Sequence, residues 1–459
     1  MKMRTEHDFL GEREVSGDAL YGIHTLRAAE NFALDYRLVH PYLVRAIILV
    51  KKAAARTWEQ LGVKPELSQA IVAACDDLLS GNGGTIREFV SGSNPFIVDA
   101  LQGGAGTSTN MNVNEVVANT ALRLLGKEAG DYTACSPLDD VNRGQSTNDV
   151  YPTALRIAAI ELLRELSAEC AALQESLQQK ENEFAGIAKL GRTELMDAVP
   201  VTLGSEFGAW AQAVGRDRWR LYKMEERLRQ VNIGGMAVGR GIPAGDAGAS
   251  LFRRYRQRVI ETLRDMCGIG LAAAEYPMDI TQNCDVFVEV SGLLKALAVN
   301  VSKIAGDLRL MNSGPCGGLG EIRLAPVQAG SSIMPGKINP VIPEMAIQVA
   351  IKVESNDYAI SAAAGRGDFE LNAFGPLIAD SLLGSLSLLC RALVLFRTRC
   401  IDTLTANASR CAALLEASTA FAFGYVPALG YECVSSLIAR FGEDSAALRA
   451  ALEQEAAQK

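Results

Sequence analysis

Residues 330–340 bring together polar side chains that could act on a small anionic molecule. The adjacent hydroxyls of Ser331 and Ser332 are followed by the cation of Lys337 and the amide of Asn339. Lys337 and Asn339 are two residues apart, so in an extended segment they face one way and could hold a carboxylate. A serine at this place could act as a base if backbone amides and a cation stabilised its alkoxide.

The histidine content narrows the chemistry that the rest of the chain can carry. The 459 residues include three histidines, His7, His24 and His40, and their spacing fits no usual metal-binding pair. No histidine lies near the serine pair in sequence, so a Ser-His-Asp triad is unsupported. We therefore expect no metal site, and no imidazole chemistry beyond residue 40 unless the chain folds one of these histidines back.

The composition indicates a folded protein without a nucleic-acid partner. Lys and Arg number 45 against 53 Asp and Glu, a net charge of −8, whereas nucleic-acid binding needs a basic surface. Hydrophobic residues make up 49% of the chain, which argues against disorder. Ten cysteines without a CxxC pair are typical of reduced thiols that pack as small apolar residues. Neither a signal peptide nor a membrane span of about 20 apolar residues is visible, so we expect a cytoplasmic protein without a membrane partner.

Long helices must position the polar groups, because helical periodicity dominates the sequence. Residues 153–184 lack Gly and Pro, and their apolar side chains recur near the heptad period. Similar patterns cover residues 205–231, 250–268, 285–311, 343–364 and 375–406. Helices this long indicate an extended bundle, and apolar residues on two faces of one helix predict subunit association.

Short strands and polar loops complete the predicted framework. The best strand candidates are residues 189–193 and 199–201. Glycine and small polar residues gather in five stretches that interrupt the helices, namely 103–114, 142–149, 190–202, 234–248 and 313–339. Loops on a rigid helical scaffold often carry binding groups, so we expect these five to form the site.

The run GSSIMPGKINP at residues 330–340 closely resembles a signature of the aspartase/fumarase superfamily. Further blocks resemble the family in the family's order, at residues 11–27, 106–115, 141–149, 191–200 and 281–285. The opening GEREV and YGIHTLR segments are closer to the aspartase branch than to fumarases. The last sixty or so residues resemble the family poorly.

The resemblance implies an all-α, mainly helical chain in three parts. These are an N-terminal domain at residues 1–140, a central bundle of long helices at 141–395 and a small C-terminal domain at 396–459. It also implies a homotetramer in which each active site takes residues from three subunits.

The resemblance further implies a C–N lyase that eliminates ammonia from L-aspartate, or a close analogue, to give fumarate. A base removes a C3 proton, an aci-carboxylate intermediate forms, and the amine leaves from C2. No cofactor is implied, because the neighbouring carboxylate accepts the developing charge and preorganised donors stabilise it.

The same resemblance implies a role for individual residues. Ser331 corresponds to the catalytic base, and Lys337 with Asn339 to the clamp on the second carboxylate. Asn148 and Thr193 correspond to contacts with the leaving amine. Hydroxyl donors around the reacting carboxylate correspond to Thr107, Ser108, Ser146, Thr147 and Ser332. Ser146 and Thr147 could instead, or in addition, cap the N-terminus of a helix.

Glu194 departs from the family pattern, since relatives carry His or Gln there. In relatives this side chain pairs with a carboxylate that corresponds to Glu344. Two neighbouring carboxylates cannot both ionise cheaply, so one would hold a raised pKa or both would share a cation. Our hypothesis is that Glu194 favours an ammonium or substituted amine as leaving group, or donates its proton. The alternative is that Glu194 points into solvent or pairs with an arginine.

Arg240 is a second departure, in a stretch where Met236 and Pro243 also replace family residues. It could bind an additional anionic group, which would suit an N-substituted aspartate. A salt bridge at a subunit interface is the alternative. Cys284 replaces a usual Thr, which we expect to affect packing, and residues 425–436 lack a family motif connected with closure of the site.

Two other functions stay open at this point. A fumarate hydratase would give the same product, but the missing His at position 194 argues against it. A non-catalytic structural member of the family is the alternative from another class. The presence of Ser331, Lys337 and Asn339 argues against that reading.

Overall fold

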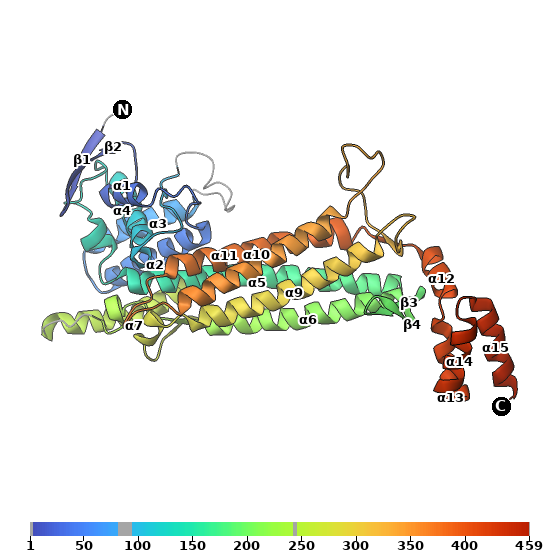
Figure 1. The fold of residues 1–459 in the computed structure, drawn as a ribbon. Helices are drawn as coiled ribbons and strands as arrows, with labels where there is room; N and C mark the ends of the chain where they lie inside the picture. The colour runs from blue at the N-terminus through green and yellow to red at the C-terminus, as the bar shows by residue number, and fades with distance from the viewer. Residues whose placement is uncertain (1–2, 81–93, 242–245, 459) are drawn as a thin grey trace. The chain divides into compact units, whose positions relative to one another are not determined.

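Helices make up most of the described residues, and several of them are long, which confirms the predicted all-α class (Figure 1). The computed structural model describes residues 3–80, 94–241 and 246–458. The six longest helices on the predicted patterns are α5 (Thr147–Glu183), α6 (Leu203–Leu228), α7 (Asp246–Cys267), α9 (Asp285–Met311), α10 (Val341–Ala364) and α11 (Gly375–Phe396). The helix predicted at 285–311 has those bounds, whereas the pattern at 375–406 ends early, where a π-helical turn follows at Arg397–Ile401.

Strands in the described part of the chain pair only as two-stranded sheets. β3 (Ala188–Thr193) and β4 (Met196–Thr202) form an antiparallel hairpin that contains both predicted strands. The other pairs are β1 (Met3–Asp8) with β2 (Gly11–Ser16), β5 (Gln230–Val231) with β6 (Ala272–Ala273), and β7 (Ile322–Arg323) with β8 (Thr405–Ala406).

Shorter helices precede and connect the long ones. In the N-terminal part these are α1 (Ile23–Asn31), α2 (Pro41–Gln60), α3 (Pro65–Ser80), α4 (Thr107–Leu124), a 3-10 turn at Gly104–Gly106 and a π-helical turn at Pro137–Val141. Farther along lie a 3-10 turn at Met236–Val238 and α8 (Asp279–Gln282). α2 starts at a proline, which suits a first helical position because its missing N–H has no partner there.

The chain forms two compact units, each built from three segments. Unit 1 comprises Met1–Leu166, Arg220–Lys295 and Lys352–Leu388, and unit 2 comprises Ser167–Trp219, Ala296–Ile351 and Leu389–Lys459. The borders between the units fall inside α5, α6, α9, α10 and α11. This grouping does not test the predicted boundaries near residues 140 and 395, which stay a prediction.

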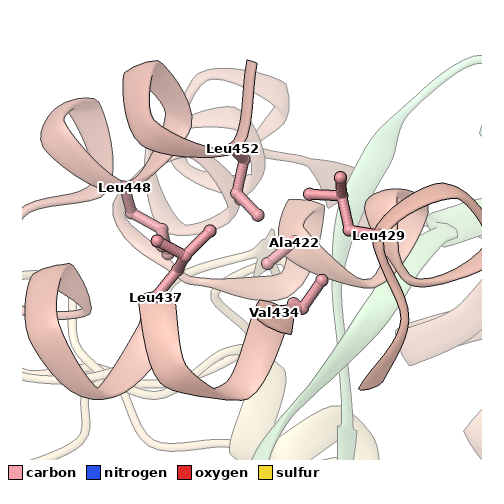
Figure 2. Close-up of a cluster of buried hydrophobic side chains, with 6 residues drawn as sticks. All are labelled: Ala422, Leu429, Val434, Leu437, Leu448 and Leu452. Carbon is pink, nitrogen blue, oxygen red and sulfur yellow. The ribbon is translucent and has the colours of Figure 1, made fainter. Parts of the chain in front are cut away.

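The C-terminal segment has a small apolar core of its own within unit 2. Its elements are α12 (Ala408–Ala417), a 3-10 helix at Ala420–Tyr425, α13 (Val426–Leu429), α14 (Tyr431–Phe441) and α15 (Ser445–Gln458). Figure 2 shows the buried side chains of this core, which come from the 3-10 helix, α13, α14 and α15, namely Ala422, Leu429, Val434, Leu437, Leu448 and Leu452.

None of the ten cysteines, all of which lie in the described part of the chain, forms a disulfide in the structure, and half of them are buried. One described helix, Gly375–Ile401, is long and apolar enough to cross a membrane, but 72% of its most apolar window is buried inside the structure. That degree of burial is typical of a core helix. Among the described residues, no group of three or more His, Cys, Asp and Glu side chains could hold a metal ion.

Candidate active site

The N-terminus of α5 is built by a reciprocal pair of hydrogen bonds in unit 1. Ser146 Oγ accepts the backbone N–H of Asn148 at 3.2 Å, and the Asp149 carboxylate accepts the N–H of Ser146 at 2.9 Å. This is a capping box, which satisfies amides that the first helical turn leaves without partners. It confirms the predicted capping role of Ser146, and it leaves the positive end of the helix dipole at Thr147 and Asn148.

The same helix end anchors a second loop of unit 1. The other oxygen of Asp149 accepts the N–H groups of Gly234 at 3.1 Å and of Met236 at 2.8 Å. The side-chain amide of Asn148 donates to the carbonyl of Ala237 at 2.8 Å. Arg240 follows on this loop and is exposed. The structure therefore brings Asn148 and the loop of Arg240 together, while Pro243 lies outside the described residues.

Burial sets the electrostatics beneath this helix end. Asp149 is fully buried, and burial raises the pKa of its carboxyl to about 7 although three N–H groups and Lys51 favour the charged form. Lys51 of α2 is fully buried as well, and burial lowers the pKa of its ammonium group to about 7. Its Nζ donates to Asn142 Oδ1 at 2.8 Å and to Gln145 Oε1 at 3.0 Å, and so supports the turn that leads into α5.

Thr107 and Ser108 open α4, also in unit 1. The turn before them needs glycine, because Gly106 has a φ of 91° and a Cβ there would lie 2.3 Å from the ring of Tyr151. Thr107 Oγ1 donates to the carbonyl of Gly104 at 2.7 Å. Thr107 is exposed and Ser108 is half-buried, so both lie close enough to the surface for a ligand to reach.

A small pocket in unit 1 adjoins the start of α5. Its lining includes Thr147, Asn148, Thr281, Cys284 and Asn372. The buried Asn232 fixes one wall, because its side-chain amide donates to the carbonyl of Asn148 at 3.0 Å and to Thr281 Oγ1 at 2.8 Å. Burial raises the pKa of Cys284 to about 11, so it remains an uncharged thiol in the wall, in line with the packing role expected for it.

Thr193 and Glu194 lie at the tip of the β3–β4 hairpin in unit 2. Glu194 and Leu195 connect the strands with φ angles of 54° and 65°, a turn that ordinarily favours Asn and Gly. Thr193 and Glu194 are both exposed. Glu344 at the start of α10 has its carboxylate 3.6 Å from Arg309, and its predicted pairing with Glu194 stays a prediction.

The loop of Ser331 in unit 2 is closed on itself by short-range hydrogen bonds. Ser331 Oγ accepts the N–H groups of Ile333 at 3.2 Å and of Met334 at 2.9 Å. Across the loop, Asn339 Nδ2 donates to the carbonyl of Gly330 at 2.6 Å. Ser331 is half-buried, whereas Ser332 and Lys337 are exposed. In this structure the amide of Asn339 therefore faces the loop backbone, and its role in a clamp with Lys337 stays a prediction.

A cavity of about 960 Å³ in unit 2 joins several of these residues. Lys337, Asn339 and Glu344 line it, together with three arginines that the sequence patterns did not single out, namely Arg309, Arg323 and Arg399. Four cations beside one carboxylate make the cavity suitable for anions. No spacing in the sequence marks these arginines, because they come from the end of α9, from β7 and from the π-helical turn after α11.

The structure thus divides the predicted site residues between the units. Unit 1 contains Thr107, Ser108, Ser146, Thr147, Asn148 and Arg240, and unit 2 contains Thr193, Glu194, Ser331, Ser332, Lys337, Asn339 and Glu344. Sequence reasoning missed Lys51 and Asp149. For Asp149 a signal existed, because Ser and Asp three residues apart before a helix mark a capping box.

Comparisons with known proteins agree on one family. A family model described as lyase matches residues 11–354. An aspartate ammonia-lyase of a Bacillus species is 43% identical over 95% of this chain and 90% of its own length. One from Pseudomonas aeruginosa is 46% identical over 94% of this chain and 88% of its own length. The crystal structure of a Brucella melitensis protein named fumarate lyase:delta crystallin is 44% identical, with a TM-score of 0.87 over 96% of this chain and 97% of that one.

Proposed function

Because the chain belongs to the aspartase branch of the aspartase/fumarase superfamily, we propose that it eliminates ammonia from L-aspartate to give fumarate. The observation that carries this proposal is the match of 42–46% identity to aspartate ammonia-lyases over about 95% of the chain. The substrate is a small dicarboxylate, and the reaction is reversible.

The reaction begins when Ser331, ionised to its alkoxide, removes a proton from C3 of aspartate and becomes the neutral hydroxyl. A serine alkoxide needs stabilisation, and the N–H groups of Ile333 and Met334 already donate to this oxygen at 3.2 and 2.9 Å. Amide donors aimed at an oxyanion cost no reorganisation when its charge develops. Such support makes Ser331 a better base than an isolated hydroxyl, whose proton is otherwise too tightly held.

The intermediate carries two negative charges on the carboxylate next to C3. Hydroxyl donors suit this group, because they direct hydrogen bonds at it without adding charge. In the proposal these donors are Thr107, Ser108, Ser146, Thr147 and Ser332. The dipole of α5 adds to them, since its positive end lies at Thr147 and favours an anion.

The second carboxylate and the amine need separate contacts. Lys337, exposed on the cavity wall, supplies a cation for the second carboxylate, and Asn339 supplies an amide. Asn148 and Thr193 contact the leaving amine. Glu194 lies next to Thr193. Its carboxylate pairs with the ammonium group of the substrate, which leaves as ammonia, or its protonated carboxyl donates a proton to an uncharged amine as that amine leaves. Glu344 is its neighbour in the completed site.

The division of these residues between two units suits a site completed by assembly. We propose a homotetramer whose active sites combine residues from three subunits. In the single chain, large apolar side chains are exposed along the long helices, including Trp219, Tyr222, Val299, Ile351 and Tyr358. Contact with further subunits would remove them from water. The three-part domain division and a cytoplasmic location, in line with ten free thiols, belong to the same proposal.

An N-substituted aspartate is the second candidate substrate. The observation that favours it is the position of Arg240, which is exposed on the loop that Asn148 and Asp149 hold through Ala237 and Met236. A guanidinium beside the amine contact could pair with an anionic group attached to nitrogen.

The experiment offers L-aspartate, L-malate and N-substituted aspartates separately and follows fumarate by its ultraviolet absorbance. The proposal predicts fumarate and ammonia from L-aspartate. Faster release from a substituted aspartate would establish the second candidate instead. Fumarate from L-malate alone would indicate a hydratase, and no fumarate from any of them would indicate a non-catalytic member.

A further inference from the structure

Glu321 lies where the glycine-rich stretch before the Ser331 loop ends and the short strand β7 begins. Its side chain is fully buried. Its N–H donates to the carbonyl of Met311 at 2.8 Å, and its carbonyl accepts the N–H of Asn407 at 2.8 Å. Backbone hydrogen bonds therefore hold the chain at Glu321 on both of its peptide groups.

The carboxylate of Glu321 joins this point to strand β3. Arg192 Nη1 donates to its Oε1 at 2.8 Å, and Lys189 Nζ lies 3.1 Å from its Oε2. Lys189 also donates to Glu206 at 2.8 Å. Two cations and two carboxylates thus balance one another. Buried charges are retained only when they are paired and hydrogen-bonded, because removal of one partner leaves the other unpaired away from water.

Strand β3 leads directly into the turn that carries Thr193 and Glu194. Arg192 is the residue before Thr193, and the turn has two non-glycine residues at positive φ, Glu194 and Leu195. Backbone in that region costs about 1–3 kcal/mol per residue and persists only where the surroundings fix it. A buried ion pair one residue away from the turn is such a constraint.

Helix α12 and the residue before it contact both β3 and the end of the glycine-rich stretch. The helix packs against β3 (Figure 1). Arg410 donates to the carbonyls of Gly318 at 3.1 Å and Leu319 at 3.0 Å, and Asn407 Nδ2 donates to the carbonyl of Gly320 at 2.9 Å. Hydrogen bonds therefore connect the end of the glycine-rich stretch to the C-terminal segment, and the ion pairs of Glu321 connect it to β3.

We propose that Glu321 is a positioning residue that fixes the turn of Thr193 and Glu194 relative to the base of the Ser331 loop. This inference rests on the proposed function, in which Thr193 contacts the leaving amine and Ser331 removes the C3 proton. Glu321 does not touch substrate. It acts through Arg192 and Lys189, so its loss displaces the turn of Thr193 and Glu194 from the position that it takes in the assembled site and slows elimination after aspartate has bound.

The test compares the single variant Glu321→Gln with a double variant that carries both Glu321→Gln and Arg192→Gln. The double variant removes one negative and one positive charge, and it leaves the Lys189–Glu206 pair intact. Glu321→Gln strands Arg192 and should lower both the melting temperature and kcat for fumarate formation. The double variant removes both members of the pair, so its melting temperature should return toward that of the wild type. Its kcat should stay about 10- to 100-fold below that of the wild type, and its KM should stay within about threefold of the wild-type value, because the ion pair that connects Glu321 to β3 is still missing.

Glu183→Gln is the matched control. Glu183 is half-exposed, and its partner Lys180 in the same unit also donates to the carbonyl of Leu404 at 3.0 Å, so the variant should change neither quantity. If kcat returns together with the melting temperature in the double variant, the network only stabilises the fold and the proposal is wrong. Wild-type kcat in Glu321→Gln would also overturn it. The wild-type enzyme is assayed in parallel. If that enzyme forms no fumarate from L-aspartate, the proposed function fails, and the role of Glu321 fails with it.

Discussion

The carboxylate of Asp149 accepts the backbone N–H of Met236 at 2.8 Å, although the two residues lie 87 positions apart in sequence. Met236 has a φ of 60°, a conformation that a non-glycine residue keeps only when its surroundings fix it. Asp149 therefore fixes the loop that leads to Arg240 against the end of α5 that carries Thr147 and Asn148. Any change in the charge of Asp149 should affect this part of the site.

The ammonium group of Lys51 is one of the groups that favour the ionised form of Asp149, and this gives a prediction about pH. Burial raises the pKa of Asp149 to about 7, and the ammonium group of Lys51 opposes that rise. The ionised carboxylate accepts the Gly234 and Met236 amides more strongly than the neutral acid does, so activity should fall as the pH drops through about 7. Lys51→Met removes the opposing cation and raises the pKa of Asp149 further. The acidic limb of kcat/KM should therefore move to higher pH, measured from pH 5.5 to 9.

Lys52→Met is the control for that variant, since Lys52 is the next residue of α2 and pairs with Asp76 near the surface. Its profile should match that of the wild type. Lys51→Met also leaves Asn142 and Gln145 without their cation, so the free energy of unfolding should fall by about 1–3 kcal/mol. If the acidic limb of kcat/KM does not move in Lys51→Met, the ionisation of Asp149 does not determine the pH dependence of activity.

Glu194→Gln tests whether this carboxylate acts on the leaving amine. A hydrogen bond to a charged group is worth about 1.5–3 kcal/mol, so its loss should lower kcat/KM for aspartate about 10- to 100-fold and alter the pH–rate profile. Asp197→Asn on the same hairpin is the control, because Asp197 is exposed on β4 just beyond the turn. An unchanged pH–rate profile in Glu194→Gln would mean that Glu194 points into solvent throughout the reaction.

Arg240→Met tests the second candidate substrate. If this guanidinium pairs with an anion on the substrate nitrogen, the variant should lose about tenfold more kcat/KM on an anionic N-substituted aspartate than on aspartate. The measurement is the ratio of kcat/KM for the two substrates in wild type and variant. Equal losses on both substrates would assign Arg240 to the protein's own packing or assembly.

Gly106→Ala tests the close approach between the turn before α4 and the first turns of α5. A Cβ there would meet the Tyr151 ring at 2.3 Å in addition to the cost of a φ of 91°. Gly126 provides the control, with a φ of 68° and open space around its Cβ position. Gly126→Ala should cost about 1 kcal/mol in the free energy of unfolding, from backbone conformation alone. Gly106→Ala should cost at least about 2 kcal/mol more in urea titrations, and equal costs would show that Tyr151 moves aside freely.

Local patterns in the sequence predict the long helices but not the contacts that position the site. Residues 285–311 form α9 as predicted, because apolar side chains recur at helical spacing along the whole segment, although Gly292 and Gly306 lie within it. The cap at Ser146 could also be predicted, since its partner Asp149 is three residues away.

Long-range contacts could not be predicted in this way. Nothing in the sequence of α2 distinguishes Lys51 from Lys52, yet Lys51 is fully buried and its partners Asn142 and Gln145 lie more than ninety positions away. The tie between Glu321 and Arg192 joins residues 129 positions apart. Such pairs depend on how the elements pack, so a residue type and its sequence neighbours do not reveal them.

Ser331→Ala tests the central claim that Ser331 is the base for elimination from aspartate. The measurement is the rate of fumarate formation from saturating L-aspartate, followed by ultraviolet absorbance, in wild type and variant. Removal of a base that transfers a proton in the transition state should lower kcat by about 10²- to 10⁴-fold. The fold should be preserved, because the Ser331 hydroxyl accepts hydrogen bonds from its own loop, at the N–H groups of Ile333 and Met334. Full activity in Ser331→Ala would contradict the assignment of the base and the mechanism built on it.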